Sequence, residues 1–363
     1  MPPIPIYSKE GLSGISSIKS HTTSRTPEGI EFPMMEYAKD NFNRVHKERF
    51  KAPVERTLDE VVVWQGRALK TSVRTLPANL VPAALQAFRN VTGYMGYRQT
   101  GKRQDDHCIK LLRNALLRPE EFRDEIYCQI CKQVTRNPTE NGTIRGWQLF
   151  TICLATFCPS IELQAHLVTF VTYYCQPNVG YRNKQVTQYA NTCLIALEKN
   201  LHQSAREEIP TLEELVTLQD HTKVPMTVTF LDGTYQTVNV DSWTTGKEME
   251  RMIAAEKGLQ CIEAYAIFEV GTNDQERRLD PEERILDLSS LWMRMRSEMK
   301  SKLFRNGSSL VDYSLQFKVF LHVEVDIDQV EDIKMMYIQV SCRSIIVYHH
   351  SWYTNLKSCI GGE

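Results

Sequence analysis

The stretch Arg123-Asp-Glu-Ile-Tyr-Cys-Gln-Ile-Cys-Lys-Gln133 combines a helical apolar period with an unusual number of charged and amide side chains. Ile126 and Ile130 lie four residues apart, as residues on one helix face do, and Tyr127 with Cys131 forms a second stripe beside them. An ordinary core helix does not need Arg, Asp and Glu within one turn. The stretch therefore predicts a helix that is buried on most sides and held by internal polar bonds.

Helical periods continue on both sides of this stretch, from about Glu31 to His221, and predict an all-α domain. The start signals include Pro at first helical positions and a capping box at Thr211-Leu-Glu-Glu214. Residues 1–30 are rich in Ser, Thr, Pro and Gly and are predicted to be a flexible segment. The predicted helices are 80–95, 109–116, 119–134, 148–157, 159–174, 186–201 and a short one from 211.

The apolar period changes at Val224 from helical to alternating. Two alternating runs flank Leu231-Asp-Gly233, which predicts a hairpin, and a helix that Gly258 closes comes next. A hairpin, one helix and further strands are the order of a ubiquitin-like β-grasp fold, so the fold class predicted for the chain is multidomain, α and α+β. The predicted strands are 226–230, 234–240, 264–270 and 315–325, the helix is 244–257, and residues 293–307 are expected to form a basic, polar loop.

Length and composition restrict the class of protein. A chain of 363 residues with 42% apolar and 24% charged residues predicts two or three ordinary globular domains. The formal net charge of −1 argues against a nucleic-acid partner, and no run of eighteen apolar residues predicts a transmembrane segment. The ten cysteines lie mostly in apolar helical patterns, and the start does not resemble a signal peptide, which together predict a cytoplasmic protein.

The motifs that suggest chemistry are all incomplete. Gly96 with Gly101-Lys102 nearly forms a phosphate loop, but Arg103 stands where Ser or Thr must bind magnesium. Cys128 and Cys131 have zinc spacing without a second ligand pair, so packing in a core is preferred for them. Cys153 and His166 could form a catalytic pair, but the favoured interpretation is that Cys153 is a buried thiol and His166 a partly exposed imidazole. We therefore predict no enzyme activity, and no catalytic, cofactor-binding or metal-binding residue.

Several separated motifs resemble the myosin tail homology 4 (MyTH4) domain. They are Tyr37-Ala-Lys39, Tyr94-Met-Gly96, Arg118-Pro-Glu-Glu-Phe-Arg-Asp-Glu-Ile-Tyr-Cys-Gln129, Arg145-Gly-Trp147 and Phe157-Cys-Pro-Ser160. The segment that follows resembles the first lobe of a FERM domain, and the chain departs from the FERM pattern after Gln339. The predicted division is a flexible segment over 1–30, a MyTH4 domain over 31–221, a ubiquitin-like first FERM lobe over 222–325, and the start of a second lobe with a divergent tail over 326–363.

The resemblance implies the MyTH4–FERM tail region of an unconventional myosin of the VII, X or XV kind, with its FERM domain truncated after the first lobe. Such a module links microtubule- or actin-based structures to cargo or adhesion-receptor proteins, without a cofactor, in the cytoplasm and cytoskeleton. Tubulin is the candidate filament protein, and peripheral membrane contact is a further candidate. The alternatives are a MyTH4–FERM adaptor without a motor and a fragment that does not bind cargo.

Two basic groups are candidates for binding a microtubule or a partner. Most charge runs are simply solvated surfaces, but the resemblance to MyTH4 domains favours contact with an acidic filament. A third basic group, Arg294, Arg296, Lys300, Lys302 and Arg305, is a candidate for an acidic peptide or a lipid headgroup. The first two groups are Arg44, Lys47, Arg49 and Lys51, and Arg98, Lys102 and Arg103.

A polar set around the opening stretch is predicted to form a structural network. Its members are Arg123, Asp124, Glu125 and Arg145, with Trp147 beside them. We expect an internal salt-bridge network that fixes how two helices meet, with a partner-binding surface as the alternative. Removal of one member of a buried ion pair costs about 3–5 kcal/mol, so Arg145→Ala is predicted to destabilise the domain.

Overall fold

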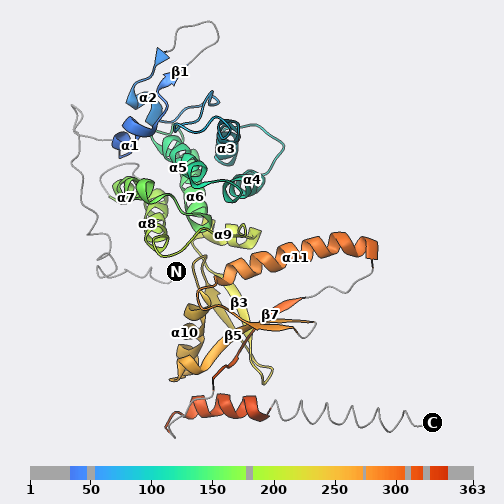
Figure 1. Ribbon diagram of the computed structural model, residues 1–363. Coiled ribbons are helices and arrows are strands. Elements are labelled where there is room, and N and C mark those ends of the chain that lie inside the picture. The colour runs from blue at the N-terminus through green and yellow to red at the C-terminus, as the bar shows by residue number, and fades with distance from the viewer. Residues whose placement is uncertain are drawn as a thin grey trace. The chain divides into compact units, whose positions relative to one another are not determined.

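The chain folds into two compact units, residues 1–209 and 210–363 (Figure 1). The computed structural model describes residues 33–46, 54–176, 183–272, 275–306, 312–321 and 328–341. The predicted flexible segment over residues 1–30 and the tail after residue 341 lie outside this described part.

The first unit is the predicted helical domain. Several of its helices begin at side-chain caps: the hydroxyls of Thr139 and Ser160 and the side-chain oxygen of Asn183 each accept a hydrogen bond from a backbone N–H in the first turn. A short antiparallel hairpin of β1 (Val45–His46) and β2 (Val54–Glu55) is added to the helices. The helices are α1 (Met35–Asn41), α2 (Leu58–Val62), α3 (Val81–Tyr94), α4 (Gln104–Leu116), α5 (Glu120–Val134), α6 (Glu140–Thr156), α7 (Ile161–Cys175) and α8 (Lys184–Lys199).

Helices α5 and α6 are both buried on most sides, which the sequence predicts for α5. Trp147 on α6 is fully buried and lies at the centre of an aromatic cluster. Its ring stacks on Phe150 and Phe170, and Tyr174 meets it edge-on at 5.0 Å. Trp147 is therefore part of the apolar core, not a member of a polar network.

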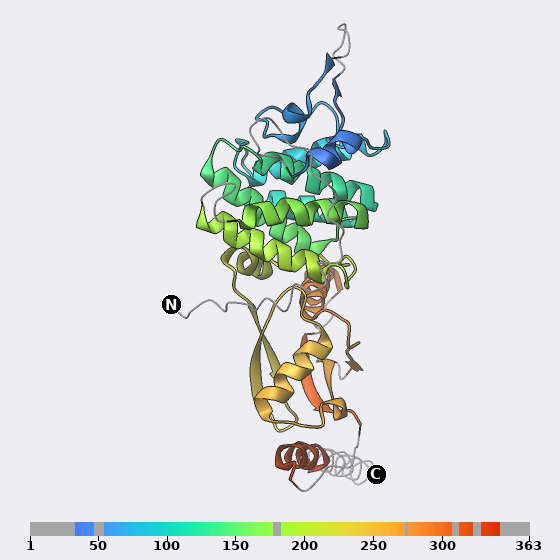
Figure 2. The same ribbon diagram turned by 90° about the vertical axis from the view of Figure 1, so that its left-hand side faces the viewer.

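The second unit contains the predicted β-grasp fold. Its mixed sheet has the strand order β4-β3-β7-β5-β6, in which β3 pairs with β7 in parallel and the other neighbours are antiparallel. Helix α10 lies across one face of the sheet (Figure 2), and Met249 and Ile253 of α10 belong to the same buried core as Phe317 and Val240 of the sheet. The elements are α9 (Leu212–Asp220), β3 (Val224–Thr229), β4 (Tyr235–Val240), α10 (Gly246–Lys257), the 3₁₀ turn Ile262–Ala264, β5 (Tyr265–Gly271), β6 (Glu276–Arg278), α11 (Ile285–Asn306) and β7 (Tyr313–Val319).

Helix α9 belongs to the second unit, although the predicted first domain extends to His221. The Thr211 hydroxyl accepts the predicted hydrogen bond from the Glu214 N–H at 3.1 Å. The Glu214 carboxylate instead accepts a hydrogen bond from the Ser242 hydroxyl at 2.6 Å, which ties α9 to the β-grasp fold. The capping box is thus half formed, because a tertiary partner takes up the carboxylate.

The prediction of a loop over residues 293–307 is wrong. Helix α11 runs without interruption to Asn306. Leu288, Trp292, Met295 and Met299 recur every three or four residues, so the helical apolar period continues beneath the basic charges that suggested a loop.

Residues 330–341 form a further helix that is docked on the β-grasp fold. The fully buried Asp332 accepts hydrogen bonds from the backbone N–H groups of Gln260 and Cys261 and from the Tyr265 hydroxyl. At the other end, the Gln339 amide bonds both the N–H and the carbonyl of Val319, at 2.7 and 2.9 Å. The start of the segment predicted as a second lobe is therefore attached to the first lobe by polar contacts.

Candidate functional site

A buried carboxylate on α5 holds a distant segment of the chain. Glu125 Oε1 accepts hydrogen bonds from the Val73 N–H and the Gln129 amide, both at 2.8 Å, and Oε2 accepts one from the Arg74 N–H at 2.7 Å. Burial raises the pKa of Glu125 to about 7, because these hydrogen bonds offset only part of the cost of removing the charge from water. Glu125 thereby fixes the strand-like segment 73–74 against α5.

The neighbouring Asp124 joins three parts of the fold. Its carboxylate accepts hydrogen bonds from the Ser160 N–H at 2.9 Å and the Ser160 hydroxyl at 2.7 Å, at the start of α7. It also forms an ion pair of 3.1 Å with Arg74, whose guanidinium lies over the Tyr37 ring. Burial raises the pKa of Asp124, while Ser160 and Arg74 lower it. The cation of the network is thus Arg74.

Arg123 and Arg145 do not take the predicted places in this network. Arg123 points to the end of α4, where its Nε donates to the Ala115 carbonyl at 3.4 Å. Arg145 is half-buried beside Gly96 and makes no hydrogen bond or ion pair with the acidic pair in the described part of the chain. Asp124 and Glu125 contact Arg74, whereas Arg123 is turned toward α4 and Arg145 lies on α6. Arg74 lies about fifty residues away along the chain, and no local spacing relates it to α5.

Lys132 is a buried lysine that the sequence reading missed. It is 2% exposed, and its ammonium group donates to the carbonyls of Val61 at 2.8 Å, Val63 at 2.7 Å and Glu60 at 3.3 Å. These carbonyls belong to the C-terminal end of α2, where a cation is favourable. Burial lowers the pKa of Lys132 to about 7, and Arg56 contributes in the same direction. Lys132 therefore docks α2 on α5.

Three exposed cations meet where α3 ends and α4 begins. Arg98 and Lys102 lie in the connecting loop, and Lys110 lies in the second turn of α4 (Figure 1 labels both helices). The ammonium group of Lys110 lowers the pKa of Lys102, and Arg98 adds to the effect, so the three charges are close together. No ion pair involves any of them within the residues described. We call Arg98, Lys102 and Lys110 the α3–α4 basic cluster.

The predicted partner Arg103 has a different role. Its side chain lies 3.7 Å from Asp106, and its backbone N–H donates to the Asp106 carboxylate at the start of α4. The predicted Arg98 and Lys102 are brought together, and Lys110 replaces Arg103 as their neighbour. Lys110 follows Lys102 by eight residues, a spacing that does not by itself predict contact. The two side chains come together because the loop turns the chain back on itself.

The buried side chain of His107 holds the loop that contains Arg98 and Lys102. This buried ring lies directly over Gly93 of α3, where a Cβ atom would be 2.6 Å from the ring. His107 Nε2 lies 3.2 Å from the Thr100 hydroxyl, which in turn accepts a hydrogen bond from the Lys102 N–H at 3.1 Å. Burial and then the cluster's cations lower the pKa of His107. A neutral imidazole thus supports the loop between the cations.

Gly96 ends helix α3 and is no phosphate-loop residue. Its φ of +85° is in the left-handed region that a glycine after a helix commonly adopts. The preceding element is a helix, whereas a phosphate loop follows a strand.

The other basic group is only partly described. Arg44 pairs with Glu55 across the β1–β2 hairpin at 3.1 Å. Lys47, Arg49 and Lys51 lie outside the described residues, so their part in binding stays a prediction.

The remaining candidates for chemistry are cysteines in the core and a histidine beside an aromatic ring. Cys128 and Cys131 are buried on α5, and burial raises the pKa of both thiols well above the usual range. Cys153 is also buried, and His166 packs against the Tyr37 ring at 5.0 Å. Within the described ranges, no group of three potential ligands could hold a metal ion, and no helix is long and apolar enough to cross a bilayer.

Residues 109–217 match the MyTH4 domain family, and residues 222–309 match the RA-like domain family. The chain contains a MyTH4 domain followed by an RA-like lobe of the FERM type. The buried network of Asp124, Glu125 and Lys132 thus belongs to the MyTH4 domain, and the β-grasp fold is the RA-like lobe.

Relatives of this MyTH4–FERM chain include motor proteins of two kinds. It is 28% identical over 292 residues to the kinesin-like protein KIN-14I of Oryza sativa subsp. japonica, which covers 78% of this chain and 23% of the relative. It is 26% identical over 287 residues to the Myosin-I heavy chain of Dictyostelium discoideum, covering 75% of this chain and 11% of the relative. The chain therefore spans less than a quarter of the length of these relatives.

Solved structures share the fold. The MyTH4-FERM MF1 domain of Dictyostelium discoideum Myosin VII superposes with a TM-score of 0.70 at 22% identity, covering 86% of this chain and 60% of that one. The C-terminal MyTH4-FERM domain of human Myosin 7b, solved in complex with a harmonin-a PDZ3 domain, gives a TM-score of 0.59 at 20% identity, covering 85% of this chain and 59% of that one. At these identities the similarity shows the fold.

Proposed function

We propose that this chain is a non-catalytic binding module whose MyTH4 domain attaches to the acidic surface of a cytoskeletal filament, with the microtubule as the candidate. The observation that carries the proposal is the α3–α4 basic cluster. Arg98, Lys102 and Lys110 are exposed and repel one another, as the lowered pKa of Lys102 indicates. Such an arrangement does not stabilise the free fold, and carboxylates of an opposing surface relieve the repulsion.

The relatives support a role in the cytoskeleton. A kinesin-like protein and a myosin heavy chain both share this domain pair over about three quarters of the present chain. The burial of Cys128, Cys131 and Cys153, with thiol pKa values raised well above the usual range, supports a structural role for these side chains over a catalytic one. We place the protein in the cytoplasm, at the cytoskeleton, on the same grounds.

The proposal assigns protein partners to the same module. The likeness to the Myosin 7b domain, which was solved with a PDZ domain bound, supports cargo proteins as the class of partner. Which part of the present chain would contact such a cargo stays a prediction.

Co-sedimentation with microtubules, and separately with actin, tests the filament proposal. We expect binding to microtubules that weakens with salt, because the Debye length falls from about 30 Å at 0.01 M to about 8 Å at 0.15 M. The double variant Lys102→Glu/Lys110→Glu should lose this binding. Binding to neither filament at low salt, or binding unchanged in the double variant, would overturn the proposal.

A matched control has the same change in net charge elsewhere. Arg294→Glu/Lys300→Glu places two reversals on α11 of the RA-like lobe and should keep microtubule binding. A third variant, Lys47→Glu/Lys51→Glu, tests the other basic group that the sequence predicts. Loss of binding in the α11 variant alone would move the filament site to the second unit.

A further inference from the structure

Helix α11 is longer than the β-grasp fold requires. Its first two turns, with Ile285, Leu286 and Leu288, are part of the apolar core. Trp292 packs against the fold: its Nε1 donates to Glu269, and its ring stacks on Tyr313 at 6.0 Å. Beyond Trp292 the helix continues for fourteen residues to Asn306, about 21 Å at 1.5 Å per residue, and extends past the edge of the sheet (Figure 1).

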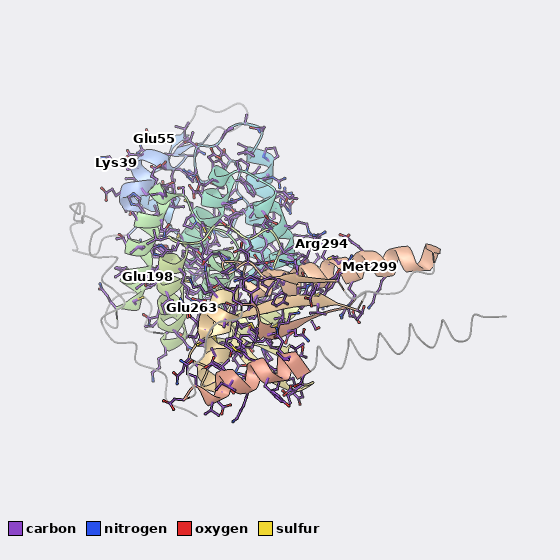
Figure 3. All side chains as sticks on the ribbon, turned by 60° about the horizontal axis from the view of Figure 1, so that its bottom comes forward. Lys39, Glu55, Glu198, Glu263, Arg294 and Met299 are labelled. Carbon is purple, nitrogen blue, oxygen red and sulfur yellow. The ribbon has the colours of Figure 1, made fainter. Side chains whose placement is uncertain are left out.

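The projecting half of α11 is amphipathic. Met295 and Met299 continue the face that Leu288 and Trp292 turn to the core, but they are not part of that core. Exposed cations stand on both sides of this stripe, with Arg296 and Lys300 on one flank and Arg294 on the other. Figure 3 labels Arg294 and Met299 on this part of the helix.

The charge of this segment is strongly unbalanced. Between residues 293 and 306 the sequence has five Arg or Lys and one Glu, in a chain whose net charge is −1. Arg294 pairs with Glu298 at 3.1 Å and Arg296 with Asp312 at 2.6 Å, but each of these pairs is about half exposed. Exposed pairs of this kind contribute little to stability, so they do not account for so many cations on one helix.

We propose that the projecting half of α11 is a membrane-surface helix that lies on a bilayer containing anionic lipids. A helix of this type places its apolar stripe at the boundary of headgroups and acyl chains, while basic residues on its flanks meet lipid phosphates and carboxylates. The Met295–Met299 stripe with its basic flanks has that arrangement. The site is separate from the α3–α4 basic cluster and independent of the filament proposal.

The position of α11 in the fold favours a flat surface over a protein that wraps around a helix. A protein groove that takes up an amphipathic helix contacts the apolar face of that helix over several turns. Here Trp292 is fixed to Glu269 and Tyr313, so the first half of α11 is unavailable. The stripe of Met295 and Met299 beyond Trp292 can rest on a flat surface while the first half of the helix stays on the sheet.

Vesicle co-sedimentation of the full chain tests the proposal. Vesicles of phosphatidylcholine alone are compared with vesicles that also contain phosphatidylserine. We expect binding only to the latter, and a loss of at least about thirtyfold in Arg294→Glu/Lys300→Glu, since each basic residue near an anionic membrane contributes about fivefold. Met295→Ser/Met299→Ser should also weaken binding, because it removes the apolar stripe and leaves the charge unchanged.

The matched control is Lys102→Glu/Lys110→Glu, which has the same change in net charge and should bind the vesicles as the unchanged protein does. Circular dichroism and thermal melting establish that each variant is folded. No binding to anionic vesicles, or equal binding by the α11 charge variant, would overturn the proposal. Binding that depends on the charges but not on Met295 and Met299 would also overturn it, in favour of an acidic protein surface.

Discussion

Charged side chains differ in burial and in partners between helix α5 and the α3–α4 basic cluster. On α5, Glu125, Asp124 and Lys132 are buried, and each is surrounded by hydrogen-bond partners of the opposite kind. In the cluster, Lys102 and Lys110 are exposed, and the nearest charges include one another. Buried charges with partners hold segments of the fold together, whereas exposed like charges do not stabilise it. The comparison thus separates residues that build the MyTH4 domain from residues available for a ligand.

The largest effect is expected from Glu125→Ala. The change leaves the N–H groups of Val73 and Arg74 and the Gln129 amide buried without an acceptor, so the free energy of unfolding should fall by about 3–5 kcal/mol. Urea unfolding measures the loss. Glu121→Ala, an exposed position on the same helix, should change stability by less than about 0.5 kcal/mol. Equal effects of the two changes would contradict the assigned role of Glu125.

Lys132 should make the stability of the MyTH4 domain depend on pH. Its pKa is lowered from 10.5 to about 7 in the folded state, so between these values the unfolded chain binds the proton and the folded domain does not. The free energy of unfolding should therefore rise with pH above 7, by about 2 kcal/mol between pH 7 and 9 relative to Lys132→Met, which lacks this group. Parallel stability curves for the two proteins would show that Lys132 stays charged.

Gly96→Ala tests the turn that presents the cluster. The left-handed φ of +85° disfavours a side chain, and a Cβ atom would lie 2.5 Å from Arg145 Nη1. We expect a loss of about 1–2 kcal/mol by thermal or urea unfolding. Gly101→Ala in the same loop meets nothing within 4 Å and should be close to neutral.

Arg145→Ala should cost less than about 1 kcal/mol. The sequence predicts a large loss from a broken buried ion pair, but the cation that faces Asp124 is Arg74. Denaturation of Arg145→Ala beside Arg74→Ala decides between the two arginines. A larger loss in Arg145→Ala would identify Arg145 as the buried cation of the network.

The smallest effect on stability belongs to the cluster itself. Lys102→Glu/Lys110→Glu should leave the free energy of unfolding close to that of the unchanged protein, because neither side chain is buried and neither has an ion pair to lose in the described structure. A large destabilisation would mean that these lysines belong to the fold and would remove the contrast with α5.

Local patterns predicted most of the secondary structure. Apolar periods located α3 to α8 and the β3–β4 hairpin, and Gly258 was correctly placed as the left-handed end of α10. The basic segment of α11 is a helix and not the predicted loop, because Trp292, Met295 and Met299 keep a helical spacing beneath its charges. Charged residues indicate that a segment is exposed to water, whereas the spacing of its apolar residues indicates its conformation.

Sequence alone determined the kind of domain, the burial of α5 and the presence of Asp124 and Glu125 in its interior, because these depend on residue type and periods of a few residues. Only the tertiary structure decided the partners: Arg74 for Asp124, the carbonyls of α2 for Lys132, and Lys110 for Lys102. The carboxylates and Lys132 act across tens of residues of chain, and Lys110 meets Lys102 only after a turn. Such pairs are set by how segments pack, and spacing along the chain does not encode that geometry.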